Sequence, residues 1–486
     1  MRPPKKILRR RISSHPGIRL TLCSPDTMHF IALWLFGISF LGDRYALAKK
    51  LPFLLCFYNN DASERGVTRA VYDYAHYAEI YLPNVKSRII LPLTMNSSNP
   101  LSDGLGPETE TLSKYSAMLQ RETRISRRKF LPEFSKRFEV SFCGEAYSED
   151  LVRRLAEDIL ALKVQGGQSA TMEYACSDLT TFALALGCGA VYIQKGGLMN
   201  HPPRYPDSFS GSIPTIVHAV FNWEPHGTVY GAISDSMRGY SRKYQGNIVP
   251  YIVTPPPTFK VQSFRARFEI RETALVVCRH GGESTFDISY ARKALRMAIQ
   301  KFNQSQIHFV FLGTTSFKKW LVDSCSKDES EKVIQTSNQR QACLSAVNSQ
   351  VHFIPTTVDE RVRESYFATC DVMLHARADG ETFGLAVAEF SVRNKPVLTN
   401  RPRGARQSPA HLRALGDQAL LYSSEGDIMS WLEKFIHSGL PKGNFTAFRR
   451  YYPEQVMKIF KTTFFDIVAP LAGKSGIQNR TAIWGR

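Results

Sequence analysis

Two glutamates eight positions apart, Glu381 and Glu389, carry the chemistry that stands out in this chain. Glu381 follows an apolar run at 372–374 and a polar loop. Glu389 lies in the segment 383–390, whose apolar spacing predicts a buried helix, and a short strand is predicted at 395–399. This order of strand, loop, helix and strand is typical of parallel α/β sheets, which bind ligands at the carboxyl ends of their strands. We therefore expect both carboxylates to border a ligand site.

Both carboxylates also have an ordinary structural interpretation. The helix predicted to begin at Gly384 offers unpaired N–H groups and the positive end of its dipole, which suit a diphosphate. Two acids beside such a site could hold the hydroxyls of a sugar and of a ribose. In the alternative, Glu381 is a capping carboxylate and Glu389 is a solvated helix residue.

The wider stretch 371–400 resembles a known donor-site signature. A glutamate, a Phe-Gly pair, a helix of small residues, a second glutamate and a Lys-Pro-Val before a strand are similar to family 4 glycosyltransferases of the GT-B fold. The resemblance covers 371–400 well, 268–315 moderately and the amino half only in general layout. It implies that the following residues of the stretch contact a nucleotide-sugar donor: Thr382, Phe383, Gly384, Leu385 and Glu389.

A glycine-rich turn after Arg279 belongs to the same implied donor site. The strand predicted from Leu275 ends in Arg279, followed closely by Gly281 and Gly282. The resembled family has an arginine and then a lysine there, and the two cations neutralise the donor diphosphate. The lysine is not at its place, so either Lys293 reaches in from the next helix or hydroxyl and backbone N–H groups replace it. The planar fork of Arg279 suits bidentate phosphate binding, and a surface salt bridge is the alternative.

Polar residues follow or end the strands predicted in the amino half. We predict this half to contain strands at 51–58, 87–93, 138–143, 190–193 and 215–217, a basic insertion at 94–137 and a helix at 149–163. Gly66 and Lys195 lie where the backbone or a side chain would meet a cleft or an acceptor, although Gly66 also suits a plain turn. The loop is not GxGxxG, which argues against a dinucleotide oxidoreductase. The resemblance places a histidine near the transferred sugar, matched by His218, yet a histidine among apolar residues is more often a core residue.

Length and composition indicate more than one globular domain. The 486 residues are 43% hydrophobic, and the net charge of +19 favours anionic partners such as nucleotides, nucleic acid or a membrane surface. Three consecutive prolines at 255–257 indicate a stiff linker. The domains we predict are a targeting or anchor segment at 1–48, an amino-terminal Rossmann-like acceptor domain at 49–253, a linker at 254–265, a carboxyl-terminal Rossmann-like nucleotide-sugar-binding domain at 266–445, helices crossing back at 446–470 and a tail at 471–486.

The amino terminus has the pattern of a targeting segment. A basic stretch precedes an apolar run at 28–41, which at 14 residues is short for a spanning helix of about 20. Ala46-Leu47-Ala48 resembles a cleavage site. We expect a secretory signal or short anchor, and thus the membranes of the ER or Golgi. An organellar transit peptide or a buried element of the fold are the alternatives.

Neither a zinc site nor a metal-binding acidic pair is visible in the sequence. Nine cysteines occur without a CxxC pair, which predicts that most are small buried hydrophobes. No two aspartates stand two positions apart, so the metal-binding DxD of the other large glycosyltransferase fold is missing. We therefore expect no metal, and we expect Arg279 and the helix end at Gly384 to neutralise the phosphates.

The sequence thus predicts an α/β, GT-B-like fold with two Rossmann-like parallel-sheet domains facing a cleft. The resemblance implies a retaining transfer of a sugar from a nucleotide-sugar to an acceptor hydroxyl, with Glu381 and His218 as catalytic residues and no cofactor or metal. The acceptor would be a glycan, lipid or protein, with possible membrane association through the amino terminus and no specific nucleic-acid binding. The alternatives are a GT-B-like sugar-nucleotide epimerase and a non-catalytic basic binding protein.

Overall fold

The computed structural model of the protein describes thirteen segments of the chain. They are residues 52–59, 66–92, 137–143, 179, 183–184, 186–199, 213–240, 247–282, 284–314, 316–326, 337–357, 359–401 and 408–472. The predicted targeting segment at 1–48, the helix expected at 149–163 and nearly all of the insertion at 94–137 lie outside the described residues, as does most of the tail at 471–486. Among the helices in these segments, none is long and apolar enough to cross a membrane.

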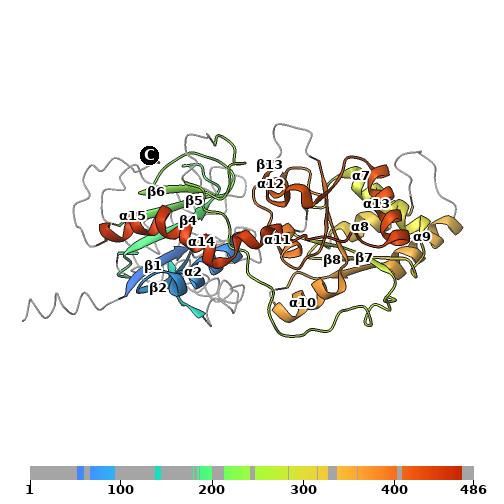
Figure 1. The fold of residues 1–486 in the computed structure, drawn as a ribbon, viewed down its shortest axis with the longest axis horizontal. Helices are drawn as coiled ribbons and strands as arrows, with labels where there is room; N and C mark the ends of the chain where they lie inside the picture. Colours follow the sequence, from blue (N-terminus) through green and yellow to red (C-terminus); the bar gives the residue numbers. More distant parts are fainter. Residues whose placement is uncertain are drawn as a thin grey trace, which may run out of the picture. The chain divides into compact units, whose positions relative to one another are not determined.

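Six parallel strands form the sheet of the amino half (Figure 1). They are β1 Phe53–Tyr58, β2 Val85–Pro92, β3 Glu139–Cys143, β4 Ala190–Lys195, β5 Thr215–Ala219 and β6 Val229–Ala232. Their order is β3-β2-β1-β4-β5-β6, so the chain reverses direction across the sheet between β1 and β4. In doubly wound sheets of this order, ligands bind at the carboxyl ends of the strands beside that reversal.

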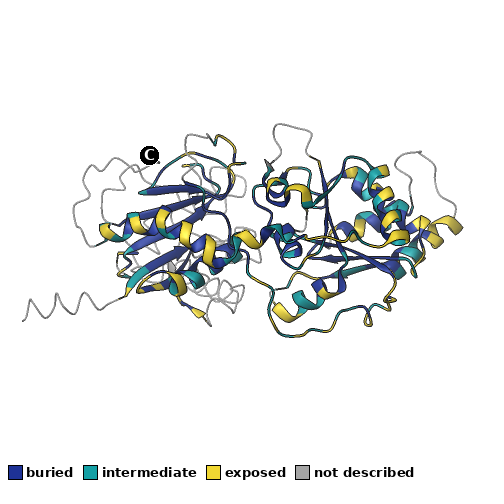
Figure 2. Ribbon diagram, viewed as in Figure 1, coloured by how far each residue is buried: buried dark blue, intermediate teal, exposed yellow. Residues whose placement is uncertain are grey.

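Continuous apolar strands explain why this sheet is buried on both faces. All six residues of β4 are buried, as are all residues of β5 and β6. Helix α2 Gly66–Tyr81 covers one face and buries Val71, Tyr74 and Ala78. Figure 2 shows most strand residues of both sheets as buried, whereas the helices alternate between buried and exposed residues.

The sheet of the carboxyl half has the same strand order. Its strands are β7 Leu275–His280, β8 Ile307–Leu312, β9 Val351–Ile354, β10 Val372–His375, β12 Val397–Asn400 and β14 Ala419–Tyr422. They run in the order β14-β12-β10-β7-β8-β9, so the reversal lies between β7 and β10. The expectation of two Rossmann-like parallel sheets is therefore confirmed.

Helices and short elements surround the second sheet. They are α7 Ser289–Lys301, α8 Ser316–Ser324, α9 Ser337–Gln350, α10 Glu360–Thr369, α11 Leu385–Ser391, α12 Ala410–Leu415 and α13 Glu425–Ser438. A small separate sheet pairs β11 Gly380–Glu381 with β13 Ser408–Pro409. It places Glu381 on a short strand.

The carboxyl-terminal helices contact the amino-terminal sheet. A 3-10 turn at Ala447–Tyr451 leads into α14 Pro453–Phe460, a π-helical turn at Lys461–Phe465 and α15 Asp466–Val468. Phe460 stacks on Tyr74 of α2 at 5.3 Å between ring centroids, and Phe464 meets His218 of β5 at 5.4 Å. Segments distant in sequence therefore share one core.

Six of the described cysteines are buried, as predicted, but they are paired in disulfides rather than separate apolar side chains. Within the described residues, disulfides join Cys56 to Cys188, Cys278 to Cys370 and Cys325 to Cys343. The first two pairs are 132 and 92 residues apart in sequence. They meet because β1 lies beside β4 and β7 lies beside β10, an arrangement that cysteine spacing alone does not reveal.

Candidate active site

Arg279 is a buried cation at the carboxyl end of β7. It is 2% exposed, and its Nη2 donates to the carbonyl and hydroxyl oxygens of Thr285 at 3.0 and 2.6 Å. Its Nε and Nη1 have no hydrogen-bond partner among the described residues. Burial lowers the pKa of Arg279, yet a guanidinium remains charged in proteins. A buried charge with unused donors is unfavourable unless an anion satisfies it.

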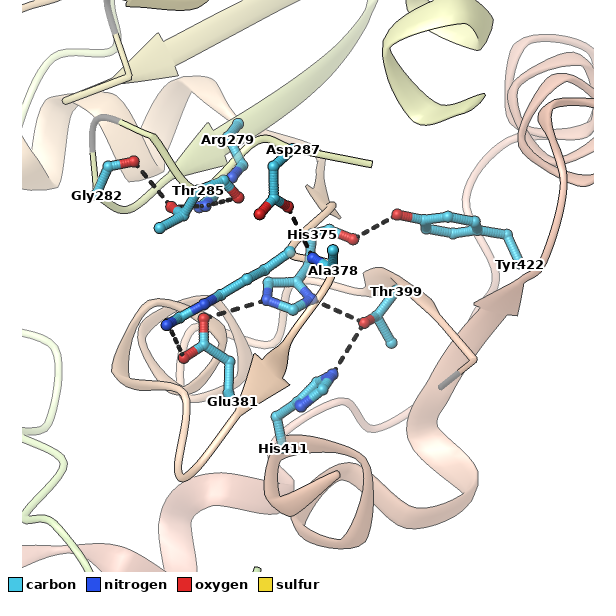
Figure 3. A network of polar contacts seen from close by, with 11 residues as sticks. Arg279, Gly282, Thr285, Asp287, His375, Ala378, Glu381, Thr399, His411 and Tyr422 are labelled. Carbon is cyan, nitrogen blue, oxygen red and sulfur yellow. Dashed lines mark hydrogen bonds and ion pairs between the residues drawn. The ribbon is translucent and has the colours of Figure 1, made fainter. Parts of the chain in front are cut away.

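The glycine-rich turn is shaped around this guanidinium. Gly281 has φ +147°, and a Cβ there would lie 2.4 Å from Nη1 of Arg279, so only glycine fits. The carbonyl oxygen of Gly282 accepts a hydrogen bond of 2.8 Å from the hydroxyl of Thr285 (Figure 3). Gly281 therefore lies against Arg279, and Gly282 is linked to Arg279 through Thr285.

Glu381 is held by His375, the last residue of β10, and by Arg377 in the loop after it. Its Oε1 lies 3.3 Å from Nε2 of His375, and its Oε2 accepts from Nη1 of Arg377 at 2.8 Å. Burial alone would raise the pKa of Glu381, but the hydrogen bond from His375 and the charge of Arg377 outweigh burial and lower that pKa to about 2. Glu381 is therefore a carboxylate at neutral pH.

A chain of hydrogen bonds fixes the orientation of His375. Its Nδ1 lies 2.9 Å from the hydroxyl of Thr399, which lies 3.2 Å from Nε2 of His411 (Figure 3). Burial lowers the pKa of both histidines, so both are neutral. A carboxylate only accepts, so Nε2 of His375 donates to Glu381 and its Nδ1 accepts from Thr399. The oxygen of Thr399 then accepts from His411, and every proton in the chain points towards Glu381.

Glu389 lies on α11, and each of its carboxylate oxygens has a partner within the protein, although a carboxylate oxygen can accept more than one hydrogen bond. Its Oε2 lies 2.7 Å from Nε2 of His280, at the end of β7, and its Oε1 forms an ion pair with Arg363 of α10. Burial would raise the pKa of Glu389, but the charge of Arg363 and the contact with His280 hold it well below its usual range. This carboxylate therefore joins the end of β7 to the helices α10 and α11.

The start of α11 is close to its predicted position. The helix begins at Leu385, with Gly384 as its N-cap at φ +92°, where a Cβ would lie 3.1 Å from that of His411. Phe383 precedes the helix and is 3% exposed, with Tyr251 at 5.4 Å between ring centroids. Thr382 and Leu385 are half-buried. Phe383 is thus a packing residue of the site.

Lys293 does not reach Arg279. It lies on α7, whose buried face is formed by Ala291, Ala294, Leu295, Ala298 and Ile299. The Nζ of Lys293 pairs with Glu425 of α13 at 3.2 Å in an exposed salt bridge. The hydroxyl of Thr285, not Lys293, lies beside Arg279. The prediction that Lys293 binds the donor is therefore wrong, and the alternative of a hydroxyl group in place of the lysine fits the structure.

His218 is enclosed by the core of the amino half. Its Nε2 donates to the carbonyl oxygen of Val249 at 2.8 Å, and its Nδ1 lies 2.6 Å from the hydroxyl of Tyr192. Burial lowers its pKa to about 3. Both nitrogens are thus used inside the protein, the arrangement of a core histidine, and no nitrogen is left to act on a substrate in this geometry.

Gly66 and Lys195 lie at carboxyl-terminal ends of the first sheet. Gly66 is the first residue of α2, and a Cβ there would lie 3.5 Å from Leu385. Lys195 ends β4 and is 4% exposed, and its Nζ donates to the carbonyl oxygen of Met199 at 3.4 Å. The amino half therefore brings Gly66 close to the signature helix, and Lys195 donates to the loop that follows β4.

Sequence spacing does not predict most of the residues that hold the two glutamates. Arg377 is close in sequence, four positions before Glu381. The others come from distant elements and could not be linked to the glutamates by spacing: His280, Arg363, Thr399 and His411.

Comparison with known proteins adds likenesses of layout. No family model matches the chain, and the search of curated proteins gives no match. Among solved structures, it is similar to a glycosyltransferase from Rickettsia africae, at 10% identity and a TM-score of 0.49 over 87% of this chain and 100% of that chain. It is also similar to the lipopolysaccharide outer core galactosyltransferase WaaB, at 12% and 0.45 over 85% and 99%. A third is HepE of Anabaena in complex with UDP, at 12% and 0.41 over 86% and 97%.

The fold itself defines the class of protein. Two six-stranded parallel sheets with one shared strand order are the GT-B layout that the sequence resemblance implies. The buried charges gather at the reversal point of the second sheet, at the ends of β7 and β10, where such folds bind ligands. This chain is therefore an α/β protein of GT-B layout whose second half has a charged candidate site.

Proposed function

We propose that this chain is a glycosyltransferase that moves a sugar from a nucleotide-sugar donor to the hydroxyl of an acceptor. One observation carries the proposal. Arg279 is a buried guanidinium whose Nε and Nη1 lack a partner in the described part of the chain, and it lies at the point where a doubly wound sheet binds ligands. A diphosphate would satisfy both donors, because the arginine fork matches phosphate oxygens.

The two glutamates supply the rest of the donor contacts. Glu389 pairs with His280, the residue that follows Arg279 on β7, and we assign its carboxylate to the ribose hydroxyls. Glu381 is ionised and rigidly held, and we assign it to the sugar ring. Positive charge develops at the anomeric carbon in the transition state, and a fixed carboxylate stabilises such charge without reorganising.

The reaction we propose retains the configuration of the anomeric carbon. The bond from that carbon to the diphosphate oxygen breaks, and a bond to the acceptor oxygen forms on the same face. The acceptor hydroxyl gives its proton to the leaving diphosphate. Arg279 neutralises the charge that collects on the diphosphate as it leaves, so we propose that no divalent ion is needed.

The acceptor and the compartment are part of the proposal. A glycan, lipid or protein hydroxyl would serve as acceptor, and 1–48 would direct the chain to the secretory pathway, with membrane association through this segment. The disulfides Cys56–Cys188, Cys278–Cys370 and Cys325–Cys343 support that route, because disulfides persist in oxidising compartments. Peptide mapping without reduction, on protein from the secretory pathway and from the cytosol, tests this: the same six thiols free in both preparations would contradict it.

The central experiment is a thermal-shift screen against UDP-glucose, GDP-mannose, ADP-glucose and their free nucleoside diphosphates. We expect one nucleotide series to raise the Tm, because a ligand at a hundred times its Kd stabilises the fold by about 2.7 kcal/mol. Release of the diphosphate only in the presence of an acceptor then distinguishes transfer from epimerisation. A protein that binds none of these nucleotides but binds nucleic acid in a salt-dependent way would be the basic binding protein instead.

A further inference from the structure

Gln194 is a buried polar residue beside the reversal point of the first sheet. It lies one position before the end of β4, the strand that neighbours β1. Its side chain is 2% exposed, and neither its amide nitrogen nor its carbonyl oxygen has a hydrogen-bond partner in the described part of the protein. Native proteins pair nearly all buried polar atoms. A carboxamide left unpaired at both ends indicates a site completed by a ligand.

Tyr251 is a second such residue. It is 5% exposed, and among the described residues its hydroxyl has no hydrogen-bond partner. Its ring meets Phe383 of the signature stretch at 5.4 Å and His218 of β5 at 6.4 Å, edge to face in both cases. The tyrosine therefore contacts both the first sheet and the loop that contains Glu381.

His218 relates the two unpaired groups to one another. Gln194 and His218 are partners in the register of β4 and β5, and partners in neighbouring parallel strands direct their side chains to the same face of the sheet. Tyr251 packs against the same histidine. His218 uses both of its nitrogens within the protein. A satisfied histidine thus has an unsatisfied carboxamide and an unsatisfied phenol as neighbours.

The chemistry of the pair favours an uncharged, hydroxylated ligand. A carboxamide both donates and accepts hydrogen bonds, as hydroxyl groups do. Burial raises the pKa of the Tyr251 phenol, and the carboxylate of Glu381 adds to the effect, so the phenol keeps its proton. The neighbouring cation, Lys195, donates to the carbonyl oxygen of Met199. Neither member of the pair is charged, in contrast to Arg279, so phosphate is not the ligand that this pair would select.

We propose that Gln194 and Tyr251 form a subsite for the hydroxyl groups of an uncharged sugar ring. The inference rests on the proposed function and extends it from the diphosphate to the sugar. Two sources present the same chemistry, the sugar being transferred and a sugar of the acceptor. Tyr251 packs against Phe383, two residues after Glu381, so either the transferred sugar or a sugar of the acceptor could contact it.

Two variants remove the unpaired groups with little change of shape, Gln194→Met and Tyr251→Phe. The matched control is Tyr230→Phe in the same sheet, because the Tyr230 hydroxyl already donates to carbonyl oxygens at 2.9 and 3.0 Å. We expect the control to lower the Tm and leave all ligands unaffected. The two site variants should keep or raise the Tm, because each removes buried atoms that lack a partner.

Binding is measured by calorimetry in two arms. The first compares UDP, GDP and ADP with UDP-glucose, GDP-mannose and ADP-glucose. If the subsite holds the transferred sugar, the site variants bind the free diphosphate within twofold of wild type and bind the nucleotide-sugar about tenfold more weakly, or 1.4 kcal/mol. The second arm titrates glucose, galactose, mannose and inositol into the diphosphate-bound protein. If the subsite holds the acceptor, the tenfold loss appears in this arm.

Wild-type affinities in both arms for Gln194→Met and Tyr251→Phe would overturn the subsite. That result is distinct from failure of the proposed function, in which wild-type protein itself binds no nucleoside diphosphate. Should either variant unfold, the other decides, since each group alone is expected to contribute a measurable loss. Weaker binding of the free diphosphates in the site variants, with no further loss for the sugars, would also contradict the inference.

Discussion

The two sheets share one strand order, yet the carboxyl edges at their reversal points differ in charge. At the second sheet, the buried cation Arg279 lies on the same edge as two half-buried carboxylates, Glu381 and Glu389, each in an ion pair with another arginine. At the first sheet, Gln194 and Tyr251 are neutral groups beside a neutral histidine. The same backbone architecture therefore presents unpaired charged donors at one edge. At the other, the cation Lys195 donates to the carbonyl oxygen of Met199, and the groups unpaired among the described residues are uncharged.

This difference indicates that two sheets of the same topology bind chemically different parts of their ligands. The strand order determines where a ligand binds, and the side chains at the reversal decide which chemistry it has. A buried guanidinium selects phosphate, whereas a carboxamide and a phenol select hydroxyls. A nucleotide-sugar and its acceptor contain both kinds of group.

The largest effect should come from Arg279→Met. The change removes a charged partner of the proposed diphosphate, and we expect the Kd for the nucleoside diphosphate to rise a thousandfold or more, about 4 kcal/mol. The free energy of unfolding should stay the same or rise, because the variant no longer buries unused donors. Calorimetry and urea unfolding on the same preparations give both quantities.

Arg265→Met is the matched control. Arg265 is also buried in the carboxyl half, but its Nη2 pairs with Asp371 at 2.8 Å and its Nη1 donates to two carbonyl oxygens. Its loss should lower the free energy of unfolding by about 3 kcal/mol and leave the Kd unchanged. If both arginine variants lose stability alike and keep nucleotide affinity, Arg279 is structural and the charged site has no ligand role.

The pH dependence of stability should distinguish the two edges by the pH range over which each of them loses stability. The folded pKa of Glu381 is about 2, below its value of 4.5 in the unfolded chain. Its stabilisation is therefore complete above pH 4.5 and is lost as the pH falls towards 2. His218 has a folded pKa of about 3 against 6.5, so its neutral form stabilises the fold above pH 6.5, and that stabilisation is lost as the pH falls towards 3.

Urea unfolding from pH 3 to 8 tests these two windows. Compared with wild type, His218→Gln should flatten the curve mainly between pH 6.5 and 3, and Glu381→Gln mainly below pH 4.5. Curves that keep the wild-type slope in both variants would show that neither group titrates as its surroundings require.

Much of this arrangement was predictable from local sequence. The apolar runs gave the strands, and the alternation of strand and helix gave two parallel sheets, because burial on both faces leaves a continuous apolar signature. The spacing of Glu381 and Glu389 and the arginine at a strand end indicated the charged edge. The wrong prediction for Lys293 also has a local explanation. Ala291, Ala294 and Leu295 define the buried face of its helix, so Lys293 lies on the exposed face.

What local sequence could not supply is the pairing between distant elements. Arg363 and His280 meet on Glu389 only because α10 and β7 flank α11, and Thr399 reaches His375 through the register of β10 and β12. Gln194 looks like any polar residue at a strand end. That its amide is buried without a partner among the described residues is a property of the fold, and the contrast between the two edges depends on it.

Truncating each of the two glutamates should change a different kinetic quantity. Glu389→Ala removes a proposed ribose contact present in both ground and transition states, so donor affinity should fall by about 1.5–3 kcal/mol with little change in kcat. Glu381→Ala should lower kcat more than affinity, because its held carboxylate acts on charge that develops only in the transition state. Steady-state kinetics with the donor found in the thermal-shift screen measure both.

Folding must be checked for both truncations, because each leaves buried partners behind. Glu381→Ala leaves His375 and Arg377 without their carboxylate partner, and Glu389→Ala does the same to Arg363 and His280. Circular dichroism and the Tm serve this purpose. If the folded variants keep the wild-type kcat and donor affinity, Glu381 is only a capping residue and Glu389 only a helix residue.

The smallest expected effect is that of chelation, for which we predict no change in activity. Arg279 already provides a full positive charge in a buried position, and a charge there interacts with phosphate more strongly than one in water. His280 and Arg377 lie on the same edge, so the leaving diphosphate has cationic or hydrogen-bond donor groups on hand without a divalent ion. Turnover in EDTA, compared with turnover after adding manganese or magnesium, measures this. Activity that disappears in EDTA and returns with manganese would mean that the charged edge requires an ion in addition to Arg279. The charge difference between the two sheets would then come mainly from a metal site, with Arg279 as a secondary cation.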